Sequence, residues 1–129
     1  MLLVKTFIKE STIPNAGMGC FAGQNISQGT KIWELNPLFD KIFTEANRLL
    51  MTDLEKQFLD IYAYKHNGLY FLCVDNARFF NHSSTPNTFD PNTEYATYAA
   101  RDIAEGEEIL SDYYTFGSTT EDFTFNRVI

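Results

Sequence analysis

Short apolar stretches separated by turn-forming residues dominate the chain, and this pattern predicts a set of short strands. Apolar residues among lysine and threonine predict a strand over residues 4–8, and alternation over residues 30–35 predicts a second strand that ends before a proline. We expect these two strands to pair as a small hairpin sheet. Between them, residues 13–23 (IPNAGMGCFAG) hold three glycines and a proline, which predicts turns. Residues 69–74 predict a buried strand, and residues 95–100 predict another β segment.

One stretch has a clear helical period. Thr52 and Glu55 have the spacing of a capping box, which predicts that a helix begins there. Apolar side chains recur at helical intervals after it, at Leu54, Phe58, Ile61 and Tyr62. We expect this face to pack on the sheet. A shorter helical turn is expected over residues 45–50. The pattern as a whole predicts a mainly β chain with short helices.

Residues 78–88, RFFNHSSTPNT, have neither helical nor strand periodicity after Phe80. A run of polar residues inside an aromatic-rich chain requires hydrogen-bond partners for its backbone and side chains. The pattern therefore predicts a structured loop rather than a linker.

Composition and charge restrict the size of the domain and the kind of partner. The chain has 129 residues, 44% hydrophobic and 16% aromatic, which predicts a single globular domain. Its formal net charge is −7, which disfavours a nucleic-acid partner because phosphate binding depends on clustered lysine and arginine. A basic protein or peptide suits such a surface, although solubility alone is another explanation for the charge.

The cysteine pattern and the apolar runs bear on metal binding and location. Cys20 and Cys73 have no CxxC spacing, so we expect reduced, buried thiols and no metal site. Lys5 and Lys9 interrupt the first apolar run, which is unlike a secretory signal. No segment approaches the roughly 18 apolar residues of a membrane span, and we expect a cytoplasmic protein that does not bind membranes.

Nucleophilic hydrolysis is one chemistry to weigh, because a histidine, serines and aspartates occur together. The residues that it would use are His82, Ser83, Ser84, Ser111, Asp75 and Asp112. The chain lacks a GxSxG elbow, and an adjacent His and Ser do not easily face each other. A phosphate-binding loop is excluded because the Walker lysine and the six-residue glycine fingerprint are both missing.

Three blocks in order resemble the SET domain, the family of S-adenosylmethionine-dependent protein lysine methyltransferases. They are GMGCFA at 17–22, RFFNHSSTPNT at 78–88 and GEEILSDYYTF at 106–116. The resemblance covers nearly the whole chain and is greatest to the compact stand-alone bacterial members. It implies a β-clip-like fold with knot-like threading of the last block, in one domain over 1–129 with its core at about 2–116 and a tail at 117–129.

The same resemblance implies roles for individual residues. Tyr113 would be the catalytic tyrosine. The residues implied to bind the cofactor S-adenosylmethionine are Gly17, Met18, Gly19, Arg78, Asn81 and His82, the last mainly through its backbone. Candidate walls of the substrate-lysine channel are Tyr62, Tyr64, Ser111 and Tyr114. No metal is implied.

Two departures from the family pattern affect what we expect. Ser84 stands where relatives usually carry cysteine, and the cysteine-rich segment that often follows the last block is absent, so the aromatic tail from Phe116 to Phe125 would close the channel. Ser111 stands where relatives often carry a bulky ring, which leaves room for more than one methyl group. The expected partner is a basic protein or peptide, and a homodimer would complete the substrate groove. The alternative is a SET-like module that binds its cofactor or a partner without turnover.

Overall fold

The computed structural model describes residues 1–66 and 68–113, and these form many short strands with few helices. The strands are β1 (Thr6–Glu10), β2 (Met18–Ala22), β3 (Lys31–Glu34), β4 (Lys41–Phe43), β5 (Tyr64–His66), β6 (Leu69–Leu72), β7 (Asn81–His82), β8 (Thr88–Phe89), β9 (Ala96–Ala99) and β10 (Leu110–Ser111). The helices are α1 (Glu45–Leu49), α2 (Asp53–Tyr62) and the short 3₁₀ helix η1 (Asn76–Phe79). The prediction of a mainly β chain with short helices is confirmed.

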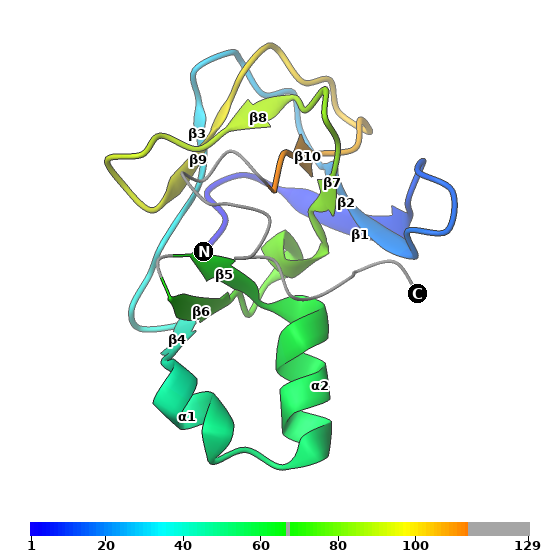
Figure 1. Ribbon diagram of the computed structural model, residues 1–129. Helices are drawn as coiled ribbons and strands as arrows, with labels where there is room; N and C mark the ends of the chain where they lie inside the picture. The colour runs from blue at the N-terminus through cyan, green and yellow to red at the C-terminus, as the bar shows by residue number, and fades with distance from the viewer. Residues whose placement is uncertain (67, 114–129) are drawn as a thin grey trace.

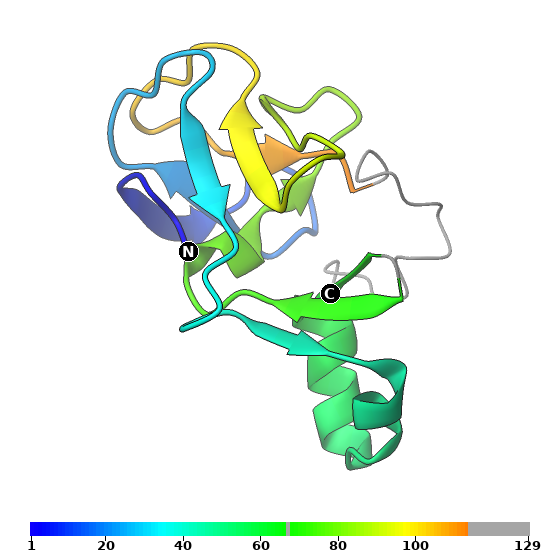
Figure 2. The ribbon, with the colours of Figure 1, turned by 90° about the vertical axis from the view of Figure 1, so that its left-hand side faces the viewer.

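The strands form four small sheets with the orders β1-β2, β10-β7, β3-β9-β8 and β4-β6-β5. Figures 1 and 2 both place sheet β4-β6-β5 and the two α-helices at the opposite end of the molecule from sheet β3-β9-β8. The β10-β7 pair and η1 lie between these ends, and this middle region carries the candidate site (Figure 1).

The predicted hairpin of residues 4–8 with residues 30–35 is wrong. β1 pairs antiparallel with β2, and β3 pairs with β9. The segment expected to contain only turns therefore holds strand β2, whose last four residues are buried. The apolar residues of β2 pack into the main core, and this burial outweighs the flanking glycines.

Helix α2 is confirmed, with the predicted capping box between Thr52 and Glu55, and the turn over 45–50 is confirmed as α1. The face expected to pack on the sheet is different, however. Leu59 is the buried residue of α2, whereas Leu54 and Phe58 are exposed.

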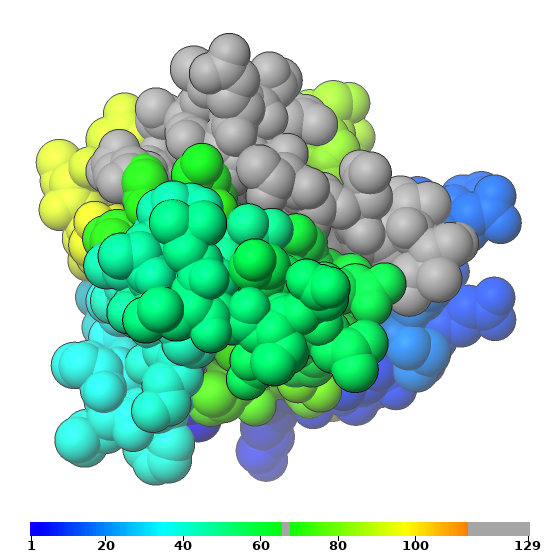
Figure 3. Space-filling model, turned by 60° about the horizontal axis from the view of Figure 1, so that its bottom comes forward, coloured from blue at the N-terminus to red at the C-terminus, as the bar shows by residue number. Residues whose placement is uncertain are grey.

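An ion pair joins α2 to the neighbouring helix α1. Arg48 of α1 binds both carboxylate oxygens of Asp60, at 3.1 and 2.7 Å. Asp60 faces α1 in this ion pair, and Leu59 packs with Ala63 and Tyr70 in a second, smaller core. The helices lie on the face shown in Figure 3.

Among the helices of the described residues, none combines the length and apolar character needed to cross a membrane.

Residues 78–88 are an ordered loop, as predicted. Asn87 donates to the carbonyl oxygen of Glu108 at 2.8 Å and accepts from the backbone N–H of Leu110 at 2.9 Å. The hydroxyl of Thr88 donates to the carbonyl of Leu110 at 2.8 Å. These bonds fasten the loop along the strand that leads to Tyr113. The knot-like threading of the last block stays a prediction.

Candidate active site

The parallel pairing of β7 with β10 positions Tyr113. Asn81 lies opposite Leu110 and His82 opposite Ser111 in this register. Two residues beyond Ser111, the backbone N–H of Tyr113 donates to Nδ1 of His82 at 3.1 Å. The rings of His82 and Tyr113 are in contact, with centroids 5.2 Å apart. The loop and the last block therefore hold each other through main-chain and side-chain contacts.

The Tyr113 hydroxyl has a defined direction. It donates to the carbonyl oxygen of Phe80 at 2.6 Å. A half-buried tyrosine held at both its backbone and its hydroxyl has little freedom to move. Such a group is suited to positioning a reacting atom.

Tyr113 lines an aromatic pocket of ≈ 680 Å³ that is open to solvent, which we call the Tyr113 pocket. Its walls include the aromatic side chains of Trp33, Tyr64, Phe80, Tyr95 and Tyr113, with Ser111, Asp90, Pro91 and Glu94. Burial raises the pKa of Tyr64 well above its ordinary value. Burial also raises the pKa of Asp90 to about 7, partly opposed by a hydrogen bond with Thr97.

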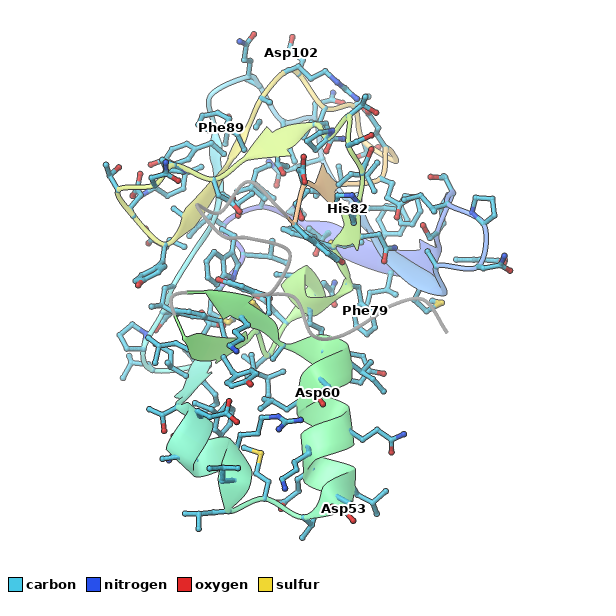
Figure 4. All side chains as sticks on the ribbon, in the orientation of Figure 1. Asp53, Asp60, Phe79, His82, Phe89 and Asp102 are labelled. Atoms are coloured by element: carbon cyan, nitrogen blue, oxygen red, sulfur yellow. The ribbon has the colours of Figure 1, made fainter. Side chains whose placement is uncertain are left out.

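A second hollow, of ≈ 400 Å³, lies next to Arg78, and we call it the Arg78 hollow. It is lined by Ala16, Met18, Ile61, Tyr62, Arg78, Phe79 and Asn81. The Arg78 guanidinium lies 5.2 Å from the ring centre of Tyr62 and 4.9 Å from that of Phe79. The hollow thus combines a cation with aromatic faces. Phe79 lies between the end of α2 and the strand that carries His82 (Figure 4).

Residues 77–81 separate the two hollows. Ala77 and Phe80 line the Tyr113 pocket, whereas Arg78, Phe79 and Asn81 line the Arg78 hollow. In the 3₁₀ turn of η1, which ends at Phe79, side chains three residues apart share a side, and this places Ala77 and Phe80 together on the Tyr113 pocket. Because the Tyr113 hydroxyl binds the Phe80 carbonyl, it lies on the wall that the two hollows share.

A buried carboxylate holds this wall to the N-terminal strands. Glu108 accepts hydrogen bonds from Ser11, from Thr12 and from Asn81 Nδ2, the last at 3.2 Å. Burial by itself raises the pKa of Glu108, but these hydrogen bonds together hold it below its ordinary value. The same Asn81 nitrogen donates to the carbonyl of Met18 at 3.0 Å.

Gly19 is required by this arrangement. A Cβ added there would lie 2.3 Å from Oε2 of Glu108, closer than nonbonded atoms come in folded proteins. Gly17 has a different role, since its φ of +75° lies in the left-handed region and the space beside it is open. Gly19 is therefore needed for space beside Glu108, and Gly17 for its left-handed backbone conformation.

The structure brings together most of the residues singled out from the sequence, although not in the groups expected. Tyr64 and Ser111 line the pocket of Tyr113, as expected for channel walls. Tyr62 instead lies in the Arg78 hollow with Met18, Arg78 and Asn81. Tyr114, predicted as a channel wall, and the tail residues Phe116 to Phe125 lie outside the described residues.

Sequence reasoning missed Asp90, Trp33 and Glu108. Glu108 had a signal, because a charged residue stands directly before the apolar pair Ile109 and Leu110. Asp90 had none, since the sequence FDPN reads as an ordinary turn. The hydrolytic arrangement gains no support, because Nδ1 of His82 is bound to the Tyr113 amide and the Ser83 hydroxyl lies 3.3 Å from that of Thr85.

Comparison with known proteins identifies the kind of domain. The family model of the SET domain matches residues 17–114. Among solved structures, the Chaetomium thermophilum polycomb repressive complex 2 matches with a TM-score of 0.64 and 19% identity, covering 85% of this chain and 15% of that chain. The same complex in an autoinhibited conformation bound to S-adenosylmethionine matches at 0.65 and 19%, covering 92% and 16%. Its apo autoinhibited form matches at 0.68 and 18%, covering 93% and 16%.

The chain spans only about one sixth of the length of the matched structures, and at these identities the likeness shows the fold alone. No curated protein matches the sequence significantly.

Proposed function

The chain belongs to the SET domain family, and from this we propose that it transfers methyl groups from S-adenosylmethionine to lysine side chains of a basic protein or peptide. The family match covers the first two blocks and residues 106–114 of the third, including Tyr113. S-adenosylhomocysteine would be the second product.

The two hollows and their shared wall are the observation that carries this proposal. A methyl transfer between two bound molecules needs two sites that meet at the reacting atoms. Here the Arg78 hollow and the Tyr113 pocket meet at residues 77–81, with the Tyr113 hydroxyl bonded to the wall between them. A domain that only bound a partner would have no need of this arrangement.

The residues of the Arg78 hollow fit S-adenosylmethionine. Arg78 offers a cation for a carboxylate, and the faces of Tyr62 and Phe79 suit flat or cationic groups. Met18 is 46% exposed, and the open space at Gly17 lets a ligand approach the main chain. When bound, S-adenosylmethionine supplies a methyl group on a positively charged sulfur. The solved structure that contains this compound supports the assignment at the level of the fold.

The Tyr113 pocket suits the lysine side chain. A lysine ammonium with a pKa of about 10.4 must lose a proton before its nitrogen can act as a nucleophile. Apolar aromatic walls disfavour the charged form and so assist this loss. Tyr113, held at its amide and its hydroxyl, would orient the amine. The net charge of −7 would attract a basic substrate.

The direct test is transfer of a labelled methyl group from S-adenosylmethionine to a mixture of basic proteins, with the modified residue identified by mass spectrometry. We expect label on lysine. Intact cofactor binding by calorimetry without any labelled product from a range of basic proteins would instead favour a module that binds without turnover.

Asn81→Ala should weaken S-adenosylmethionine binding by at least about tenfold. Its amide nitrogen bonds both the Met18 carbonyl and Glu108, and losing one buried hydrogen-bonded group costs about 1–3 kcal/mol. Calorimetry on the folded variant measures this effect. Asn92→Ala, in the turn before β9, is the matched control and should bind normally. Unchanged affinity in Asn81→Ala would refute its assignment to the cofactor site.

Ser111 should permit more than one methyl group to be added. It is 5% exposed and lines the Tyr113 pocket with a small side chain. Ser111→Tyr would fill part of that space, and we expect its product to shift toward monomethyl-lysine. Mass spectrometry of the products checks this. Only monomethyl product from both proteins would contradict the prediction.

A further inference from the structure

Asp90 is a carboxylate on the wall of the Tyr113 pocket with unused hydrogen-bonding capacity. It directly follows β8, and its Oδ1 is fully buried without a hydrogen-bond partner among the described residues. Trp33 Nε1 on the same wall is also unpartnered, but it is a donor. Asp90 thus brings to this wall an acceptor oxygen without a partner, which suits a hydrogen-bond donor that enters the pocket.

The groups around Asp90 leave its charge uncompensated. In the described part of the chain, no lysine, arginine or histidine forms an ion pair with it. The nearby carboxylate of Glu94 is occupied by Lys31 at 3.4 Å and by the hydroxyl of Tyr98. The other ionisable groups lining the pocket are Tyr64, Cys73, Tyr95 and Tyr113, residue types that carry no positive charge.

We propose that Asp90 receives the ammonium group of the substrate lysine through its Oδ1 and accepts a proton from it. This inference rests on the proposed function and adds a named base to it. The step is a single proton transfer. One N–H bond of the ammonium breaks, an O–H bond forms on Asp90, and a neutral amine faces a neutral carboxylic acid. The proton leaves to solvent when the product departs.

The ionisation of Asp90 fits this role. Its pKa of about 7 means that the carboxyl group gains and loses a proton near neutral pH. A general base works best when its pKa lies near the working pH. An ordinary exposed aspartate, with a pKa near 4, would be a much weaker acceptor.

The first experiment uses the wild-type protein and n-butylammonium chloride, which mimics the end of a lysine side chain. Carbon-13 NMR follows the Asp90 carboxyl carbon as the pH changes. We expect a midpoint near 7 that moves down by about one unit with butylammonium, because a nearby cation favours the ionised form. Sodium chloride at equal ionic strength should move it much less. Equal shifts with both salts would overturn the proposal.

The second experiment compares Asp90→Asn with wild type in methyl transfer. We expect kcat/KM at pH 7 to fall about 100-fold. The change of slope near pH 7 in the pH profile of kcat/KM should disappear, since an amide accepts no proton. Asp102→Asn removes an equal charge from an exposed aspartate that lines neither hollow and should change kcat/KM less than about twofold (Figure 4).

The two experiments separate this inference from the proposed function. A wild-type protein without methyl transfer would remove the proposed function, and the butylammonium titration would still decide whether Asp90 binds an ammonium group. An active wild type whose rate and pH profile are retained in Asp90→Asn would overturn the role of Asp90 and leave the proposed function standing.

Discussion

Replacing Tyr113 with phenylalanine should lower methyl transfer about 100-fold and leave S-adenosylmethionine affinity nearly unchanged. The hydroxyl that binds the Phe80 carbonyl at 2.6 Å lies on the wall between the two hollows, while the Arg78 hollow has no lining atom from Tyr113. Removing one fixed polar group from a reaction centre typically costs a factor of 10²–10³. Initial rates with labelled cofactor and calorimetric titration of the same protein measure both quantities.

Tyr70→Phe is the matched control for this change. Tyr70 is buried and, like Tyr113, donates from its hydroxyl, to Glu45 at 2.7 Å, but it lies in the small core under α2. We expect its rate to stay within about twofold of wild type. Equal activity of Tyr113→Phe and wild type would remove Tyr113 from the mechanism, whatever the domain then does.

Replacing Glu108 with alanine should lower the free energy of unfolding by about 4 kcal/mol and weaken cofactor binding. The change leaves the donors of Ser11, Thr12 and Asn81 without their shared acceptor, and each unsatisfied buried donor costs about 1–3 kcal/mol. Asn81 then holds the Met18 carbonyl less firmly, which loosens the Arg78 hollow. Denaturant unfolding followed by circular dichroism measures the stability.

The pH dependence of this loss has a defined sign. Because the folded pKa of Glu108 lies below its ordinary 4.5, its stabilisation is complete above that pH. It is lost as the pH falls through the folded pKa, so the difference between the two proteins should shrink in acid.

Glu107→Ala provides the control at the adjacent position. Glu107 is part-exposed and pairs with the exposed Arg101, so its loss should cost less than about 1 kcal/mol. Similar losses of stability in the two variants would contradict the role given to Glu108.

Most of the candidate site could be located from the sequence, because its residues lie within the sequence blocks typical of the family. Tyr113, Arg78 and Asn81 could be named from RFFNHS and DYY alone, and the structure places them around one wall. Tyr62 and Tyr64 could not be separated in this way. Tyr62 ends α2 and Tyr64 begins β5, and the two residues line different hollows.

The sequence by itself determined the features that depend on neighbouring residues. The capping box of Thr52 and Glu55 closes within three residues, and the polar loop 78–88 had to be ordered because its hydrogen-bonding groups needed partners. Only the tertiary structure decided that β1 pairs with β2, that residues 77–81 divide two hollows, and that Asp90, with its Oδ1 buried, lines the same pocket as Tyr113. Local hydrogen bonds are encoded by adjacent residue types, whereas the direction and burial of a side chain depend on segments far away in the chain.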